Sequence, residues 1–84
     1  MKMNKIDSSI IRRDGPFKEF KQDASIVSVR LKSGKVFKQV LLLYPDNIIG
    51  MKGYRSLPFE VNEVMEVFQD TVDLASRSER DWLF

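Results

Sequence analysis

Residues 25–47 read SIVSVRLK–SG–KVFKQVLLLY–PDN, two strand-like runs with a turn after each. In the first run Val27, Val29 and Leu31 alternate with polar residues, the pattern of an antiparallel strand with one buried face. Gly34 can adopt the positive φ that a tight turn requires. The second run is apolar on both faces over residues 40–43, so we expect both to be covered, one by the barrel interior and the other by the N-terminal helix or a neighbouring chain.

Shorter runs follow, each bounded by residues that interrupt strands. Pro45 ends the second long run because proline has no N–H to donate to a neighbouring strand. The chain then continues IIGMK (48–52), LPF (57–59) and EVMEVFQ (63–69). The last run follows a tight turn at residues 60–62; its valines also fit a helical spacing, but its β-branched content favours a strand. Short strands without room for crossover helices predict a mostly β fold, an antiparallel sheet closing into a small barrel.

The segment before the barrel suggests a short helix. It covers residues 4–13, can be capped by Asp7 or Ser8, and is stopped by Asp14-Gly15-Pro16. A helix of barely two turns is stable only against a surface, so we expect it to lie on the barrel.

The segment after the barrel is a polar tail, residues 70–84, that ends in Trp82-Leu83-Phe84. Three apolar residues at a terminus are seldom left in water. We therefore expect the tail to dock on its own barrel or on a neighbouring subunit, over the outer face of the second strand. Residues 1–84 are predicted to form one domain, with the barrel at 25–69.

Composition excludes several function classes. The 84 residues contain no Cys and no His, which removes disulfides, thiolate metal sites and the commonest general base. The carboxylates Glu60, Glu63 and Glu66 step by three and look like a solvated face, so we expect no catalytic site, no metal and no cofactor. No apolar stretch approaches the roughly 20 residues of a membrane span. We expect a soluble, cytoplasmic protein.

The net charge of +2 is unevenly distributed. Residues 1–38 hold ten Lys and Arg against four Asp and Glu, whereas residues 39–84 hold four against eight. A basic half can meet phosphate groups. The alternative is that the two halves pair, within one chain or between subunits, because the basic residues are scattered and form no run.

This order of elements resembles the Sm-like family, which includes bacterial RNA chaperones. The resemblance covers roughly residues 5–69 and rests on three motifs: VRLKSGKVF (29–37), NII (47–49) and MKG (51–53). The family fold is a short N-terminal helix followed by a strongly bent five-stranded barrel of the Sm-like or SH3-like kind. Its members form rings by pairing strand four with strand five of the next subunit, and they bind single-stranded, often U-rich, RNA near the pore.

The resemblance implies a non-catalytic cyclic homo-oligomer that binds single-stranded RNA or an RNA-associated partner. Asn47 would hydrogen-bond a base edge or brace its loop, and Lys52 with the Gly53 backbone would contact base or phosphate. The plainer alternatives are a turn asparagine, an exposed lysine and a turn glycine. The subunit interface would use the sheet edges at Leu57, Phe59, Val64, Val67 and Phe68.

The chain departs from the family pattern at informative positions. Gln39 stands where the family has the glycine that lets its second strand bend, so the bend must arise otherwise. Pro45 replaces the usual Asp, and no aromatic or His residue stands where family members stack a base.

A second interpretation is a structural or protein-interaction barrel of the SH3-like or PRC-barrel type that binds no nucleic acid. Residues 57–59 followed by 63–67 are similar to the end of PRC-barrels. A ring with a basic pore would favour RNA binding, whereas a monomer or dimer would favour this alternative.

Overall fold

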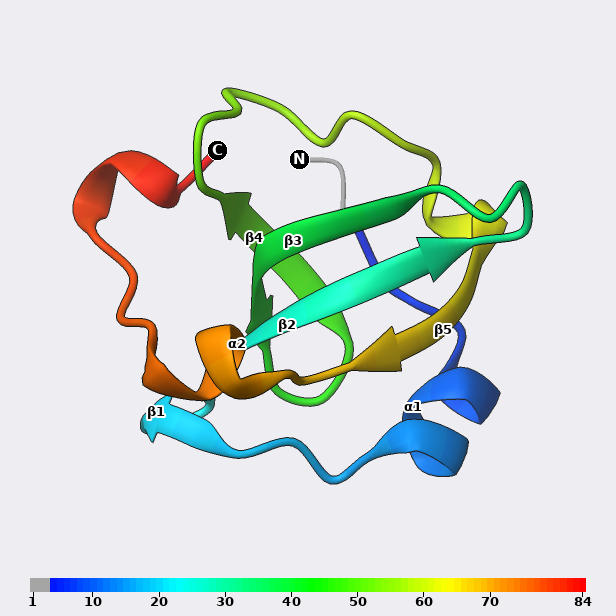
Figure 1. Ribbon diagram of the computed structural model, residues 1–84, viewed down its shortest axis with the longest axis horizontal. Helices are drawn as coiled ribbons and strands as arrows, with labels where there is room; N and C mark the ends of the chain where they lie inside the picture. The colour runs from blue at the N-terminus through cyan, green and yellow to red at the C-terminus, as the bar shows by residue number, and fades with distance from the viewer. Residues whose placement is uncertain (1–3) are drawn as a thin grey trace.

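The computed structural model describes residues 4–84, which contain five strands and two short α-helices (Figure 1). The predicted class, mostly β with a short N-terminal helix, is confirmed. No helix among these residues has the length and apolar character needed to cross a membrane. The elements in chain order are α1 (Ser8–Asp14), β1 (Glu19–Lys21), β2 (Ala24–Leu31), β3 (Val36–Leu43), β4 (Asn47–Met51), the 3-10 turn η1 (Val61–Glu63), β5 (Val64–Phe68), α2 (Thr71–Ala75) and the 3-10 turn η2 (Arg80–Trp82).

All five strands form one antiparallel sheet. Its order is β1–β2–β3–β4, and β5 pairs with β2 on the same edge as β1. The predicted edge strand at residues 57–59 is wrong, because the chain between β4 and η1 is a loop. A strand there would need an open sheet edge, and the outer edges of β4 and β5 are both occupied by other segments, as described below. The expected closure of the sheet into a barrel is wrong, because strand pairing among residues 4–84 does not join its ends.

The N-terminal helix is shorter than predicted. Asp7 is its N-cap and accepts a hydrogen bond from Ser9 N at 2.8 Å. The residues before it are extended and pair with β4: Ile6 N donates to the Asp46 carbonyl at 2.9 Å, and Ile48 N donates to the Asn4 carbonyl at 2.9 Å. This pairing keeps residues 4–6 out of the helix and buries Ile6, whose exposed fraction is 2%.

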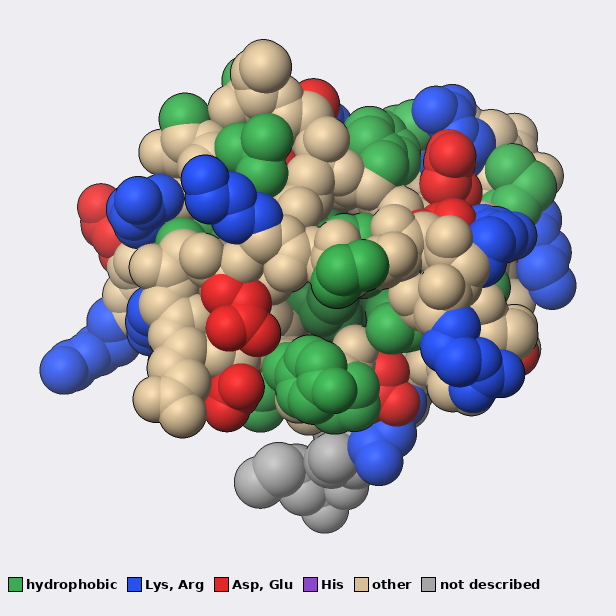
Figure 2. Space-filling view, turned by 90° about the horizontal axis from the view of Figure 1, so that it is seen from below, with side chains coloured by type: hydrophobic (Ala, Val, Ile, Leu, Met, Phe, Trp, Pro, Cys, Tyr) green, Lys and Arg blue, Asp and Glu red, His purple; other side chains and the backbone are tan. Residues whose placement is uncertain are grey.

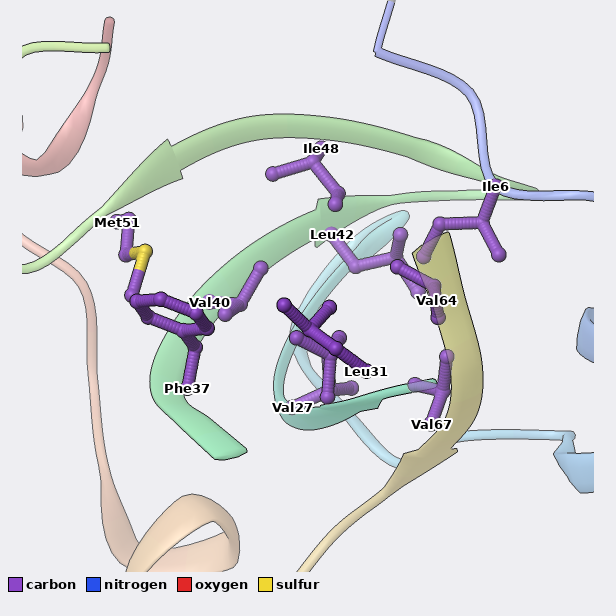
Figure 3. Close-up of a cluster of buried hydrophobic side chains, with 11 residues drawn as sticks. Ile6, Val27, Leu31, Phe37, Val40, Leu42, Ile48, Met51, Val64 and Val67 are labelled. Atoms are coloured by element: carbon purple, nitrogen blue, oxygen red, sulfur yellow. The ribbon is translucent and has the colours of Figure 1, made fainter. Parts of the chain in front are cut away.

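The main core fills the concave side of the sheet. Figure 3 shows its side chains pointing toward one another from β2, β3, β4 and β5, with Ile6 entering from the N-terminal segment. The alternating valines of β2 face this core, as the sequence pattern predicted. The buried members are Ile6, Val27, Val29, Leu31, Phe37, Val40, Leu42, Ile48, Met51, Val64 and Val67.

The bend of β3 occurs at Gln39. Val27 pairs with Val40 and Val29 pairs with Phe37, so β3 has one residue more than β2 between these pairs. Gln39 adopts φ +56° at this bulge. A bulge with a residue in the left-handed region bends its strand, so Gln39 performs the role of the glycine that the resemblance led us to expect there.

The tail covers the convex side of the same sheet. Trp82, exposed by 5%, packs with Ala24, Ile26 and Leu41 in a second buried cluster. The prediction that the tail docks over the outer face of the second long strand is confirmed, on the chain's own sheet. Residues 40–43 are apolar on both faces because Leu42 faces the main core and Leu41 faces the second cluster.

Candidate functional site

The structure separates the residues expected to bind RNA. Asn47 begins β4, whereas Lys52 and Gly53 form the turn that follows β4. Five residues of extended chain put Asn47 and Lys52 roughly 15 Å apart. Asn47 Oδ1 also accepts a hydrogen bond from Asn4 N at 3.2 Å. Asn47 therefore braces the N-terminal segment, and it does not join Lys52 in one site within a single chain.

Of the five residues expected at a subunit interface, two are buried within the chain and three are partly exposed. Val64 and Val67 belong to the main core, with exposed fractions of 1% and 2%, so their side chains are not available to a neighbour. Leu57 and Phe59 pack against the margin of that core. The Phe68 ring lies beneath two cations, with Arg30 Cζ at 5.7 Å and Lys38 Nζ at 5.5 Å from its centroid.

The outer edge of β5 is occupied by the end of α1. Asp14 Oδ2 accepts a hydrogen bond from Val67 N at 2.9 Å, and the Arg13 guanidinium donates to the Met65 carbonyl at 2.6 Å. The two side chains also pair with each other, Arg13 Nε to Asp14 Oδ1 at 2.8 Å. The hydrogen bonds from Arg13 do most to lower the pKa of Asp14. Partial burial opposes them by raising this pKa, and the hydrogen bond from Val67 N lowers it further.

The outer edge of β4 is occupied at both ends. The N-terminal segment pairs with it through Lys5 and Asn47, and the tail pairs with it through Leu83 and Gly50. Covered edges are how soluble proteins avoid strand-to-strand association. Ring assembly by pairing of these edges remains a prediction from the sequence, and it would require one of these segments to leave.

Three aromatic rings gather where β3 begins and the long loop crosses it. Phe37 and Tyr54 meet edge to face, with centroids 6.3 Å apart and ring planes at 75°. Phe37 and Phe59 lie 5.0 Å apart at 34°. Phe37 is nearly buried, but Tyr54 keeps 41% of its surface exposed. The cluster therefore presents one exposed ring against Phe37, which in turn packs on Phe59.

Three cations accompany this cluster, one beside Phe37 in space and two near Tyr54 in the sequence. Lys35 Nζ lies 5.1 Å from the Phe37 centroid, and Lys52 and Arg55 flank Tyr54 in the loop. All three are exposed, and none forms an ion pair with a carboxylate among residues 4–84. Lys52 is positioned by its backbone, since its N–H donates to the Gln39 carbonyl at 3.2 Å and Gly53 takes φ +84°. We call Lys35, Phe37, Lys52, Tyr54, Arg55 and Phe59 the aromatic–cation end.

A hollow of about 450 Å³ borders the aromatic–cation end. Its lining combines Leu31, Phe37, Leu57 and Phe59 with Lys35, Glu60 and Glu63, and most of the exposed lining is polar. The site is thus cationic on the Tyr54 side and mixed on the hollow side.

A second apolar surface lies at the far end of β3. Figure 2 shows this face, with hydrophobic side chains at its centre and both signs of charge around them. It contains a hollow of about 120 Å³ between α1, β1 and the β3–β4 turn, lined in part by Ile11, Pro16, Phe17, Leu42, Tyr44 and Pro45. Tyr44 is the most exposed large side chain there, at 69%. The mixed charges around it favour no particular anionic or cationic ligand.

One buried hydroxyl–carboxylate pair lies among the described residues. Ser28 and Asp73 form the one buried hydroxyl–carboxylate pair that could suggest a nucleophile, with Ser28 Oγ donating to Asp73 Oδ2 at 2.8 Å. Their exposed fractions are 0% and 2%, so no substrate reaches them and the pair instead fastens α2 to β2. Residues 4–84 contain no group of three Asp or Glu side chains arranged to hold a metal.

Sequence analysis identified Lys52 and Gly53 at this end but missed the aromatic residues and the two other cations. The signal was present in Lys52-Gly53-Tyr54-Arg55, where an aromatic residue and a second cation follow the turn glycine. Phe37 could not be added from the sequence, because only the tertiary structure brings β3 against this loop.

Compared with known proteins, the chain matches no family model, and no curated protein or solved structure shows significant similarity to it. The assignment of a function depends on its residues and their geometry.

Proposed function

We propose that this protein is a small, non-catalytic β-sheet domain that binds single-stranded RNA through the aromatic–cation end. The observation that carries the proposal is the exposed Tyr54 ring, which meets Phe37 edge to face. Lys52 and Arg55 are near Tyr54 in the loop, and Lys35 lies over Phe37. Single-stranded nucleic acids are bound in this way: bases stack on exposed aromatic rings while Lys and Arg contact the phosphates. The proposal retains Lys52 and Gly53 from the Sm-like resemblance and replaces Asn47 by Tyr54.

A single copy is sufficient for this proposed site. All six residues belong to one chain, and the covered edges of β4 and β5 do not take part in it. A ring would multiply the site but is not required for it.

The test is fluorescence anisotropy with short labelled oligo-U and oligo-A at low salt. Tyr54→Ala should weaken binding about tenfold, because stacking of a base on an aromatic ring contributes about 1–3 kcal/mol. Lys52→Glu should weaken binding and flatten its salt dependence, by about 0.7 in log–log slope for each lost phosphate contact. Asn47→Ala should change neither affinity nor slope.

Two matched control variants distinguish binding at this site from nonspecific binding elsewhere on the surface. Tyr44→Ala removes an equally large and more exposed ring at the far end of β3, and Arg77→Glu reverses an exposed cation outside the aromatic–cation end. Both should bind like the wild type. Equal loss in the controls would place RNA elsewhere on the surface, and no wild-type binding at low salt would end the RNA proposal.

A second candidate follows from the neighbouring hollow. Its two carboxylates, Glu60 and Glu63, lie beside apolar side chains such as Phe59 and would suit a peptide that contains a basic residue. This is the protein-interaction barrel, and failure of the oligonucleotide experiment would favour it.

A further inference from the structure

The last two residues of the tail pair with the outer edge of β4. Leu83 forms an antiparallel bridge with Gly50, and Phe84 N donates to the Ile49 carbonyl at 3.1 Å. Trp82, one residue earlier, packs over β2 and β3 on the convex side, against Ala24, Ile26 and Leu41, and is buried. A backbone pairing with one deeply inserted side chain is the usual form of β-strand addition to a sheet edge.

Gly50 makes this docking possible. A Cβ at Gly50 would lie 2.3 Å from the Trp82 carbonyl oxygen, 2.8 Å from the Trp82 carbonyl carbon and 3.1 Å from Leu83 Cα. These three nearest atoms all belong to the tail, and Gly50 does not have a positive φ. The glycine is therefore required by the close approach of the tail and not by its own backbone conformation. We call this part of β4 the Gly50 edge.

The tail is held at few points. Leu83 and Phe84 remain 49% and 40% exposed, and a hollow of about 380 Å³ lies beneath the tail, lined in part by Leu41, Leu43 and Ile49. Residues 76–79, which join α2 to η2, have no regular secondary structure and can change direction at little cost. In Figure 1 this linker runs along the outside of the molecule before the tail turns back to β4.

We propose that the Gly50 edge is a strand-docking site that accepts the tail of a second copy of this chain as well as its own. A second copy's tail has the same sequence, so it would make the same Trp82, Leu83 and Phe84 contacts, and only the linker would differ. The chain's own tail is favoured by its tethering, which corresponds to a millimolar effective concentration. In dilute solution each wild-type chain therefore docks its own tail. A tail from a second copy docks when the chain's own tail is displaced or when the protein concentration is high.

The test mixes two full-length variants, each defective in one half of the contact. Gly50→Val keeps the tail but blocks its docking site, whereas Trp82→Ala keeps the docking site but lacks the anchor. Each wild-type chain has one Trp, so Trp82 of the Gly50→Val chain is the only indole in the mixture. Its emission should be red-shifted when this variant is alone and should return to the wild-type wavelength on titration with the Trp82→Ala chain. Light scattering should then give a mass of two chains.

The control titration uses the double variant Gly50→Val/Trp82→Ala, which should produce no shift. Circular dichroism must show both single variants folded, and Gly50→Ala replaces Gly50→Val if the larger side chain prevents folding. The proposal is overturned by a wild-type emission wavelength in the Gly50 variant alone, or by an equal shift with the double variant. Absence of any shift up to about 500 µM, close to the effective concentration of a tether, also overturns it.

Discussion

At the scale of single residues, Gln39 illustrates how a departure from a family pattern can preserve a shape. The left-handed backbone at Gln39 produces the bulge that bends β3. The Cβ of glutamine makes this conformation less favourable than it would be for glycine. The bend is maintained by its surroundings: Phe37 and Val40 on either side are buried in the core, and the Gln39 carbonyl accepts a hydrogen bond from Lys52 N.

Gln39→Gly should stabilise the protein by about 0.5–1 kcal/mol, because glycine has no Cβ to strain at positive φ, and its extra freedom in the unfolded chain offsets only part of this gain. Urea unfolding measures the effect. Gln39→Ala is the matched control, since it removes the same side chain but keeps the Cβ. A Gly variant no more stable than the Ala variant would show that the backbone at Gln39 is unstrained.

At the scale of elements, the contact between α1 and β5 is a small polar lock. Asp14 is largely buried, with 14% of its side chain exposed, and its carboxylate joins the Arg13 guanidinium to the Val67 N–H. These contacts also occupy backbone hydrogen-bonding groups on the outer edge of β5, where another strand would otherwise pair.

The lock predicts a pH dependence of stability. The pKa of Asp14 is lowered in the folded state, so its stabilisation is complete above the unfolded value of about 3.9 and is lost as the pH falls through the lower folded value. Asp14→Asn should reduce the free energy of unfolding by about 1 kcal/mol at pH 7 and lessen the decline below pH 4.

The comparison is urea unfolding across this pH range, with Asp81→Asn as control, because the Asp81 carboxyl makes no hydrogen bond in the described part of the chain. The decline should not vanish, since the pKa values of Asp7 and Asp70 are also lowered. An Asp14→Asn protein with the wild-type pH profile would contradict this role for Asp14.

At the scale of the whole molecule, a single sheet is covered on both faces by one short chain. The N-terminal segment and the loop after β4 enclose the concave side, and the tail covers part of the convex side (Figure 1). Small domains have little core to spare, so each covering segment should contribute measurably to stability.

Deleting residues 81–84 should therefore lower the melting temperature. Removing the buried Trp82 should cost about 2 kcal/mol or more, and 2 kcal/mol corresponds to roughly 10 °C for a domain of this size. Thermal unfolding of the deletion variant and of full-length Trp82→Ala measures this, and the two should agree closely if Trp82 dominates. An unchanged melting temperature in both would mean that the docked tail adds no stability.

The sequence by itself determined the two long strands, β2 and β3, because the alternating valines in β2, the turn at Gly34 and the stop at Pro45 are local signals. It also determined that the tail would be covered, because Trp82 is costly to expose. Only the tertiary structure decided which residues share a surface: it separated Asn47 from Lys52, brought Phe37 beneath Tyr54, and buried Val64 and Val67. It also left residues 57–59 as a loop, because the sheet edges are covered by segments distant in the sequence. Nothing in the local sequence around Asn4, Asp14 or Leu83 indicates which strand each will contact.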